Sequence, residues 1–190
     1  MDWYRSGACA CLLLLVAAPA HAQEAAPTDP PYRFGIEFGL GSHVSDGGDA
    51  QLVSFGYHPH RDMTVVVNLE RDYLPTRVTH YPDGYAATRG GMLAFASGEF
   101  RYTVPIGARV SPYGFAGTGL GVQRPNVNEF FPHPPNNSAV HVFYVGGGAK
   151  VRLHPRLEFL VDGRFMVYAT RQADGFGALL PVRAGLAWRF

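Results

Sequence analysis

The sequence has little charge of either sign and almost no lysine. Of its 190 residues, 16 are basic and 15 are acidic, and Lys150 is the one lysine. The charged fraction of 16% lies below the roughly 25% that is usual for soluble domains. A net charge of +1 without a basic stripe excludes nucleic acid, or another simple polyelectrolyte, as the expected partner.

Cysteine and long apolar runs are also scarce. The two cysteines, Cys9 and Cys11, lie near the N-terminus, so we expect no disulfide in the mature fold. No bound cofactor is expected either. Beyond that region no run approaches the roughly 18 apolar residues of a transmembrane helix. The sequence thus leaves two classes open, a soluble β-protein or a β-barrel in a membrane.

The N-terminus carries the features of an export signal. Arg5 precedes an apolar run from Cys9 to Ala18, and the triplet AHA at 20–22 matches a cleavage site. The run is too short for a membrane anchor. We therefore expect a cleaved signal peptide over residues 1–22, followed by a polar, proline-rich periplasmic leader over residues 23–32.

From Arg33 onward the hydrophobic pattern has a period of two. In the stretch RFGIEFGL every second residue is large and apolar, and glycine or glutamate lies between. Such alternation predicts half-buried strands and argues against helices. The predicted strands cover residues 33–41, 50–58, 62–72, 91–104, 112–123, 140–153, 157–168 and 179–190. They form one β-barrel domain over residues 33–190.

The connections between these segments alternate in length. The short links are PHR, PIGARVS and HPR, whereas the long links are SHVSDGGD, YLPTRVTHYPDGYAATRG, RPNVNEFFPHPPNNSA and ATRQADGFGA. Long structureless loops are uncommon in compact soluble domains. Alternating short and long links are typical of an up-and-down barrel in an outer membrane, with the short turns on the periplasmic side.

The composition of the polar face predicts which face points inward. Long charged side chains alternate there with glycine, and glycine weakens a strand that faces solvent. The lumen of an eight-stranded barrel is just wide enough for side chains to fill, so charged residues in it need small neighbours. The apolar face ends in aromatics, as interfacial girdles do. These aromatics are Phe34, Tyr57, Phe100, Tyr102, Tyr113, Trp188 and Phe190. We predict an apolar outer wall rather than the apolar interior of a lipocalin-like barrel.

The C-terminal segment RAGLAWRF is the closing strand of this barrel, because a sheet in hydrocarbon can have no free edge. The residues Arg183, Gly185, Trp188 and Phe190 resemble the C-terminal signal that the bacterial barrel-assembly machinery recognises. Residues 33–190 as a whole resemble the small eight-stranded outer-membrane barrels of the OmpA transmembrane-domain and OmpX type.

This resemblance implies an all-β, eight-stranded antiparallel transmembrane barrel. It also implies an integral place in the outer membrane of a Gram-negative-type bacterium, among outer-membrane lipids and lipopolysaccharide. No cell-wall-binding domain is expected after Phe190. The resemblance says little about activity, because the same barrel serves many functions.

Inward charges predict a plugged lumen, because buried charges must be matched. The tight hairpin RLHPRLE pairs Leu153 with Leu157 in its most natural register. That register sets Arg152 opposite Glu158, and Lys150 opposite Leu160. The predicted charge network comprises Lys150, Arg152, Glu158, Asp162, Arg164, Glu99 and Arg101.

Catalytic and metal chemistry have weaker support. A deacylase of this size would need a His-x-Ser pair, which the sequence lacks. Ser138 and His141 are an odd number of positions apart, so a strand sends them to opposite faces. Two histidines of one turn, His58 and His60, could bind zinc or copper with His154 of another turn, although polar turn residues are the favoured interpretation.

The loop NEFFPHPPNNS exposes Phe130 and Phe131, which favours a surface contact, or packing on the barrel mouth. The prediction is a non-enzymatic outer-membrane barrel with a structural or surface-interaction role. One alternative is an outer-membrane enzyme that modifies lipid A or phospholipid. A narrow porin is the second.

Overall fold

The computed structural model describes residues 32–44, 47–80, 86–104, 106, 109–125, 137–170 and 176–190, all in strands, turns or irregular segments. No helix within these ranges is both long and apolar enough to span a bilayer. The strands are β1 (Phe34–His43), β2 (Asp49–His60), β3 (Met63–His80), β4 (Ala86–Thr103), β5 (Val110–Pro125), β6 (Ser138–His154), β7 (Leu157–Thr170), β8 (Phe176–Leu179) and β9 (Pro181–Arg189).

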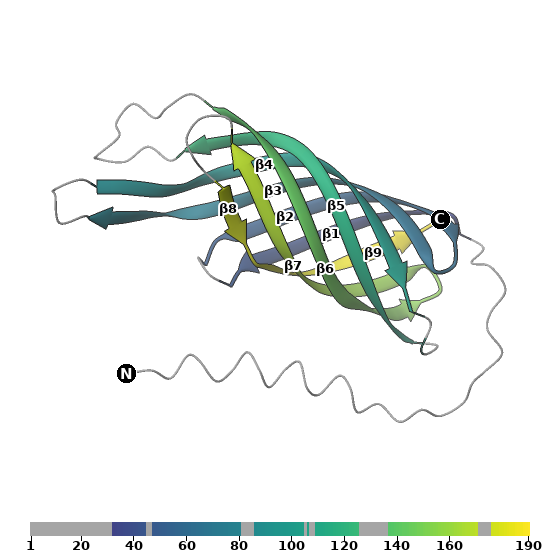
Figure 1. The fold of residues 1–190 in the computed structure, drawn as a ribbon. Coiled ribbons are helices and arrows are strands. Elements are labelled where there is room, and N and C mark those ends of the chain that lie inside the picture. The colour runs from purple at the N-terminus through teal and green to yellow at the C-terminus, as the bar shows by residue number, and fades with distance from the viewer. Residues whose placement is uncertain are drawn as a thin grey trace, which may run out of the picture.

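All strands belong to one antiparallel sheet that closes on itself (Figure 1). Each strand from β1 to β7 pairs with the next, and β9 pairs with both β7 and β1. β8 and β9 together form the eighth stave, that is, the eighth strand position around the barrel wall, because both pair with β7 and only Leu180 separates them. This break directly precedes Pro181, which has no amide hydrogen for the ladder. The predicted eight-stranded up-and-down barrel is confirmed.

The two ends of the barrel differ. The tight turns Arg61–Asp62 and Pro155–Arg156 lie at the same end as the paired backbones of Phe34 and Phe190. The β3–β4 hairpin projects from the opposite end, away from the C-terminus (Figure 1). Short turns mark the periplasmic side of outer-membrane barrels, so the hairpin projects from the end that the sequence predicts to be extracellular.

The apolar face points outward, as predicted. Phe38, Leu40 and Val67 are 56%, 69% and 55% exposed, whereas the inward Glu70 is 4% exposed. An apolar outer wall with buried carboxylates fits a barrel surrounded by lipid. Tyr113 corrects one part of the prediction, because its ring lies inside the barrel and not in an outer girdle.

Two strands, β3 and β4, are longer than the sequence predicts. β3 and β4 continue through most of the stretch that was predicted to be a long loop, and only residues 81–85 separate them. Proline and glycine in that stretch indicate a loop, although most of it is strand. Pro75 lies inside β3, where the β3–β4 register shifts between Leu74 and Arg77, and a β-bulge is one of the few places where a strand tolerates proline.

The β6–β7 hairpin has the predicted register except at its tip. Arg152 pairs with Glu158, and Lys150 pairs with Leu160. The predicted Leu153–Leu157 pair is wrong, because an irregularity between Arg152 and His154 sets His154 opposite Leu157.

Candidate functional site

The barrel interior brings together charged side chains from opposite walls. Arg164 on β7 contacts the carboxylate of Glu70 on β3, which lies four staves away in an eight-stave barrel. Arg183 on β9 lies 3.5 Å from the second oxygen of Glu70 and 2.8 Å from Asp162. All four side chains are buried. These contacts cross the lumen, so they fill its width.

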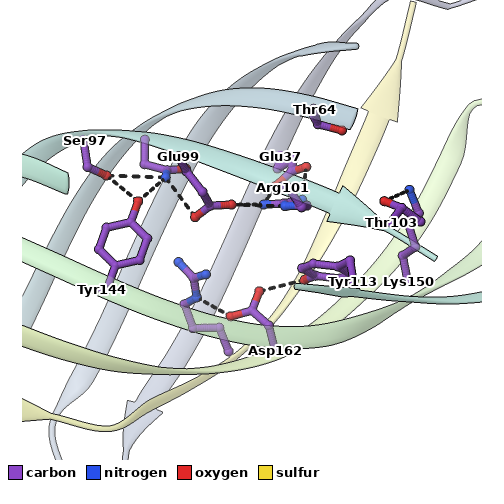
Figure 2. A network of polar contacts seen from close by, with 12 residues as sticks. Glu37, Thr64, Ser97, Glu99, Arg101, Thr103, Tyr113, Tyr144, Lys150 and Asp162 are labelled. Atoms are coloured by element: carbon purple, nitrogen blue, oxygen red, sulfur yellow. Dashed lines mark hydrogen bonds and ion pairs between the residues drawn. The ribbon is translucent and has the colours of Figure 1, made fainter. Parts of the chain in front are cut away.

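A second cluster lies around Arg101 on β4 (Figure 2). Its guanidinium donates to Glu37 of β1 at 2.8 and 3.2 Å, and to Glu99 of its own strand at 2.8 and 3.1 Å. It also lies over the ring of Tyr113, 4.8 Å from the ring centroid. A bidentate carboxylate, a second carboxylate and an aromatic face together compensate the buried cation.

Neutral side chains extend this network. Asn68 on β3 donates to Tyr144 on β6 at 2.9 Å and to Glu99 at 3.3 Å, and the Tyr144 hydroxyl lies 2.8 Å from Ser97 (Figure 2). Asn68 and Tyr144 come from strands three staves apart. The hydrogen bonds therefore connect several strands through the interior and not only along the ladder.

The end of the lumen beside the short turns holds a third group of charges. Arg189 donates to Glu158 at 2.6 and 3.1 Å, and Lys150 donates to Thr103 at 3.0 Å. Arg152 departs from the prediction. It lies opposite Glu158 in the ladder but is exposed, and the ion-pair partner of Glu158 is Arg189.

Six members of the predicted network are buried inside the barrel: Lys150, Glu158, Asp162, Arg164, Glu99 and Arg101. Sequence analysis left four charged partners out of it, namely Glu37, Glu70, Arg183 and Arg189. Each lies on the polar face of its strand, so the alternating pattern predicts that its side chain points inward. The pattern does not predict which of these side chains meet across the lumen.

The interior is also less polar than predicted. Buried apolar side chains form one cluster with the inward aromatics of β4, β5 and β6. Its members include Leu74, Leu93, Phe95, Tyr113, Phe115, Val140, Val142, Tyr144, Leu160, Met166 and Leu179. Arg164 lies 4.7 Å from the centroid of the Tyr144 ring. The inward aromatic rings of β4, β5 and β6 therefore pack against the same cations that the carboxylates neutralise.

The three histidines of the metal alternative do not converge. His58 points into the barrel and lies 2.9 Å from the Thr64 hydroxyl, whereas His60 and His154 are exposed at the ends of β2 and β6. No group of three metal-binding side chains occurs in the part of the chain that the structure describes.

Ser138 and His141 do not form a catalytic pair. His141 faces outward, contacts Thr118 at 3.0 Å and packs beside Phe143. The neighbouring Val140 and Val142 are buried and mark the inward alternation to which Ser138 belongs. The predicted opposite-face arrangement is what the structure shows.

The residues that resemble an assembly signal divide between the two faces. Arg183 and Gly185 point inward, and Trp188 and Phe190 lie on the outer wall, 45% and 54% exposed. The backbone of Phe190 completes the ladder by exchanging hydrogen bonds of 2.9 and 3.2 Å with Phe34. The predicted contact loop with Phe130 and Phe131, the signal peptide and most of the leader lie outside the described residues.

A closed all-β barrel with an apolar outer wall and a polar, ion-paired interior defines a transmembrane β-barrel. The chain belongs to the outer membrane protein beta-barrel domain family, whose model matches residues 8–190.

Solved structures share this fold. The N-terminal barrel domain of Pseudomonas aeruginosa OprF is 15% identical with a TM-score of 0.56, over 86% of this chain and 100% of that one. Neisserial surface protein A is 14% identical with a TM-score of 0.58, over 83% and 94%. A major outer membrane protein of Thermus thermophilus is 16% identical with a TM-score of 0.55, over 84% and 100%. No curated protein sequence matches the chain.

Proposed function

We propose that this protein is a non-enzymatic outer-membrane barrel with a structural or surface-interaction role and a lumen plugged by its own side chains. The observation that carries the proposal is the contact of Arg164 with Glu70 across the full width of the barrel. Buried charges held in this way occupy the space that a pore would need. Fold alone does not specify activity, so the proposal rests on these residues.

Several finer elements belong to the same proposal. The chain is exported by a signal peptide over residues 1–22 and assembled by the barrel-assembly machinery through its C-terminal strand. Its wall contacts outer-membrane lipids and lipopolysaccharide, and the extracellular loop with Phe130 and Phe131 contacts a surface partner. The separation of Ser138 from His141 supports the non-enzymatic part of the proposal.

Mass spectrometry of lipid A and phospholipids, with and without expression of the protein, tests the non-enzymatic part. We expect identical acyl-chain profiles. The loss or gain of an acyl chain on expression would instead establish a lipid-modifying enzyme. For the structural part, a strain that lacks the gene should become more sensitive to detergents, and expression of the intact barrel should restore resistance. Unchanged sensitivity would leave surface interaction as the role to measure.

A further inference from the structure

One charged side chain on the outer wall stands out from its surroundings. Arg71 on β3 is exposed on the outward alternation, between the apolar Leu69 and Tyr73. It forms no hydrogen bond or ion pair with any residue that the structure describes. The nearest outward carboxylate on β2, Asp49, lies opposite Tyr73 and therefore diagonal to Arg71, and the two do not form an ion pair.

The position of Arg71 along the barrel axis places it at the outer interface. It lies nine residues beyond the periplasmic turn at Asp62. With a rise of about 3.4 Å per residue and a strand tilt of about 40°, that is about 23 Å above the turn. The apolar band of such barrels is about 25 Å tall. The backbone of Arg71 therefore lies just below the upper edge of the band, and its long side chain reaches the headgroups of the outer leaflet.

An apolar groove of about 880 Å³ begins at Arg71 and crosses the outer wall. It runs over β3, β2, β1 and β9 and reaches Phe159 of β7. Ala184 gives it depth, because this small side chain lies beside Leu40 in the ladder and next to Leu186 along the groove. Phe159 is three residues from the turn at Arg156, hence about 8 Å above it by the same rise and tilt.

The groove therefore descends about 15 Å from a cation at the outer interface into the apolar band. An anionic headgroup above an acyl chain has the same distribution of charge and apolar surface. We propose that the groove binds one phosphorylated lipid of the outer leaflet, with the phosphate on Arg71 and an acyl chain along the outer wall. The proposal rests on the proposed contact with outer-membrane lipids and assigns that contact a site.

The chain offers a matched control for the cation. Among the strand residues whose side chains the structure describes, Arg124 is the other arginine on the outward alternation. It lies on β5, and β4 separates it from β3. It does not line the groove. Simple charge attraction would act on Arg71 and Arg124 alike, whereas a site at the groove depends on Arg71.

The test is native mass spectrometry of the purified full chain in a non-ionic maltoside detergent, titrated with bisphosphorylated lipid A. We expect one tightly held lipid. Arg71→Gln should weaken its binding roughly tenfold, the worth of one charge-assisted hydrogen bond to phosphate. Arg124→Gln should change it by less than about twofold. Lipid A stripped of both phosphates should bind as weakly to the wild-type chain as intact lipid A binds to Arg71→Gln, and inorganic phosphate should not displace the lipid.

The acyl-chain part has its own pair of variants. Ala184→Phe fills the groove with another apolar residue on the lipid-facing wall and should weaken binding, whereas Ala116→Phe on the outward face of β5 should not. The mobility shift on heating shows that each variant is a folded barrel. Equal effects of the two arginine variants, equal effects of the two alanine variants, or undiminished binding of dephosphorylated lipid A would each overturn the site even where lipid A still binds the barrel.

Discussion

Arg164 and Glu70 form an ion pair between strands that face each other across the whole barrel. The same carboxylate also receives Arg183 from β9. Glu70 therefore compensates two buried cations, each of which is 3% exposed.

The first prediction concerns this carboxylate. Glu70→Gln removes the carboxylate that Arg164 contacts and leaves Arg183 with Asp162, and an unmatched buried charge typically costs about 3–5 kcal/mol. The thermal unfolding temperature in detergent should fall clearly. The double variant Glu70→Gln with Arg164→Gln should recover part of the loss. Arg152→Gln is the control, because an exposed charge contributes about 0–1 kcal/mol. A similar shift for Glu70→Gln and Arg152→Gln would show that the interior is wet.

The second prediction separates the two possible partners of Glu158. Arg152 is its neighbour in the ladder, but Arg189 is its ion-pair partner. In double-mutant cycles read by thermal unfolding, Glu158→Gln should couple to Arg189→Gln and not measurably to Arg152→Gln. Stronger coupling to Arg152 would restore the partner that the hairpin register alone suggests.

The third prediction tests the outer wall. Val67 is outward and lies midway along the membrane-spanning part of β3, so Val67→Arg should cost about 2–4 kcal/mol or block insertion. Met63→Arg, on the same face near the periplasmic turn, should cost about 0–1 kcal/mol. Unfolding titrations in lipid vesicles measure both. If the two variants are equally stable, the outer wall is not in hydrocarbon.

The fourth prediction concerns a close contact in the lumen. Gly117 lies against the ring of Tyr144, and a methyl group built on Gly117 would overlap that ring. Gly117→Ala should displace Tyr144 from Asn68 and Ser97 and cost about 1–3 kcal/mol. Gly98→Ala is the control, because a methyl group there meets nothing within 4 Å. Thermal unfolding of both variants tests this prediction. An unchanged unfolding temperature for Gly117→Ala would mean that the Tyr144 hydrogen bonds do not contribute to stability.

The fifth prediction concerns assembly. Deleting Phe190, or changing it to Asp, removes the last step of the ladder with Phe34 or puts a charge on the lipid-facing wall. Export should continue, and the amount of protein in the outer-membrane fraction should fall. Phe190→Tyr keeps an aromatic terminus and should assemble. Normal insertion of the deletion and of the Asp variant would make the resemblance to an assembly signal accidental.

Alternation along single strands accounts for what could be predicted. It places Phe38 and Leu40 outside and Glu37 inside, and the hairpin sequence RLHPRLE sets the register of β6 and β7 up to Arg152. It fails at Tyr113, whose strand has glycine on both faces and so gives no contrast. It also fails at Pro75, because a bulge allows a strand to continue through residues that usually end one.

The contacts across the lumen are of a different kind. Glu70 and Arg164 are 94 positions apart in sequence, and their distance depends on the shear and closure of the whole barrel. The same holds for Arg101, whose partner Glu37 is 64 positions away. Sequence pattern shows that such residues point inward, but only the closed sheet decides which of them meet.

The central claim is that the protein's own side chains fill the lumen of the barrel and leave no open pore. Ion conductance of the purified, heat-modifiable protein in a planar lipid bilayer tests it most directly, with a known porin as the positive control. The account predicts no sustained stepwise current from the wild-type protein at moderate voltage. Steady, ohmic current steps that recur with each insertion event would contradict it.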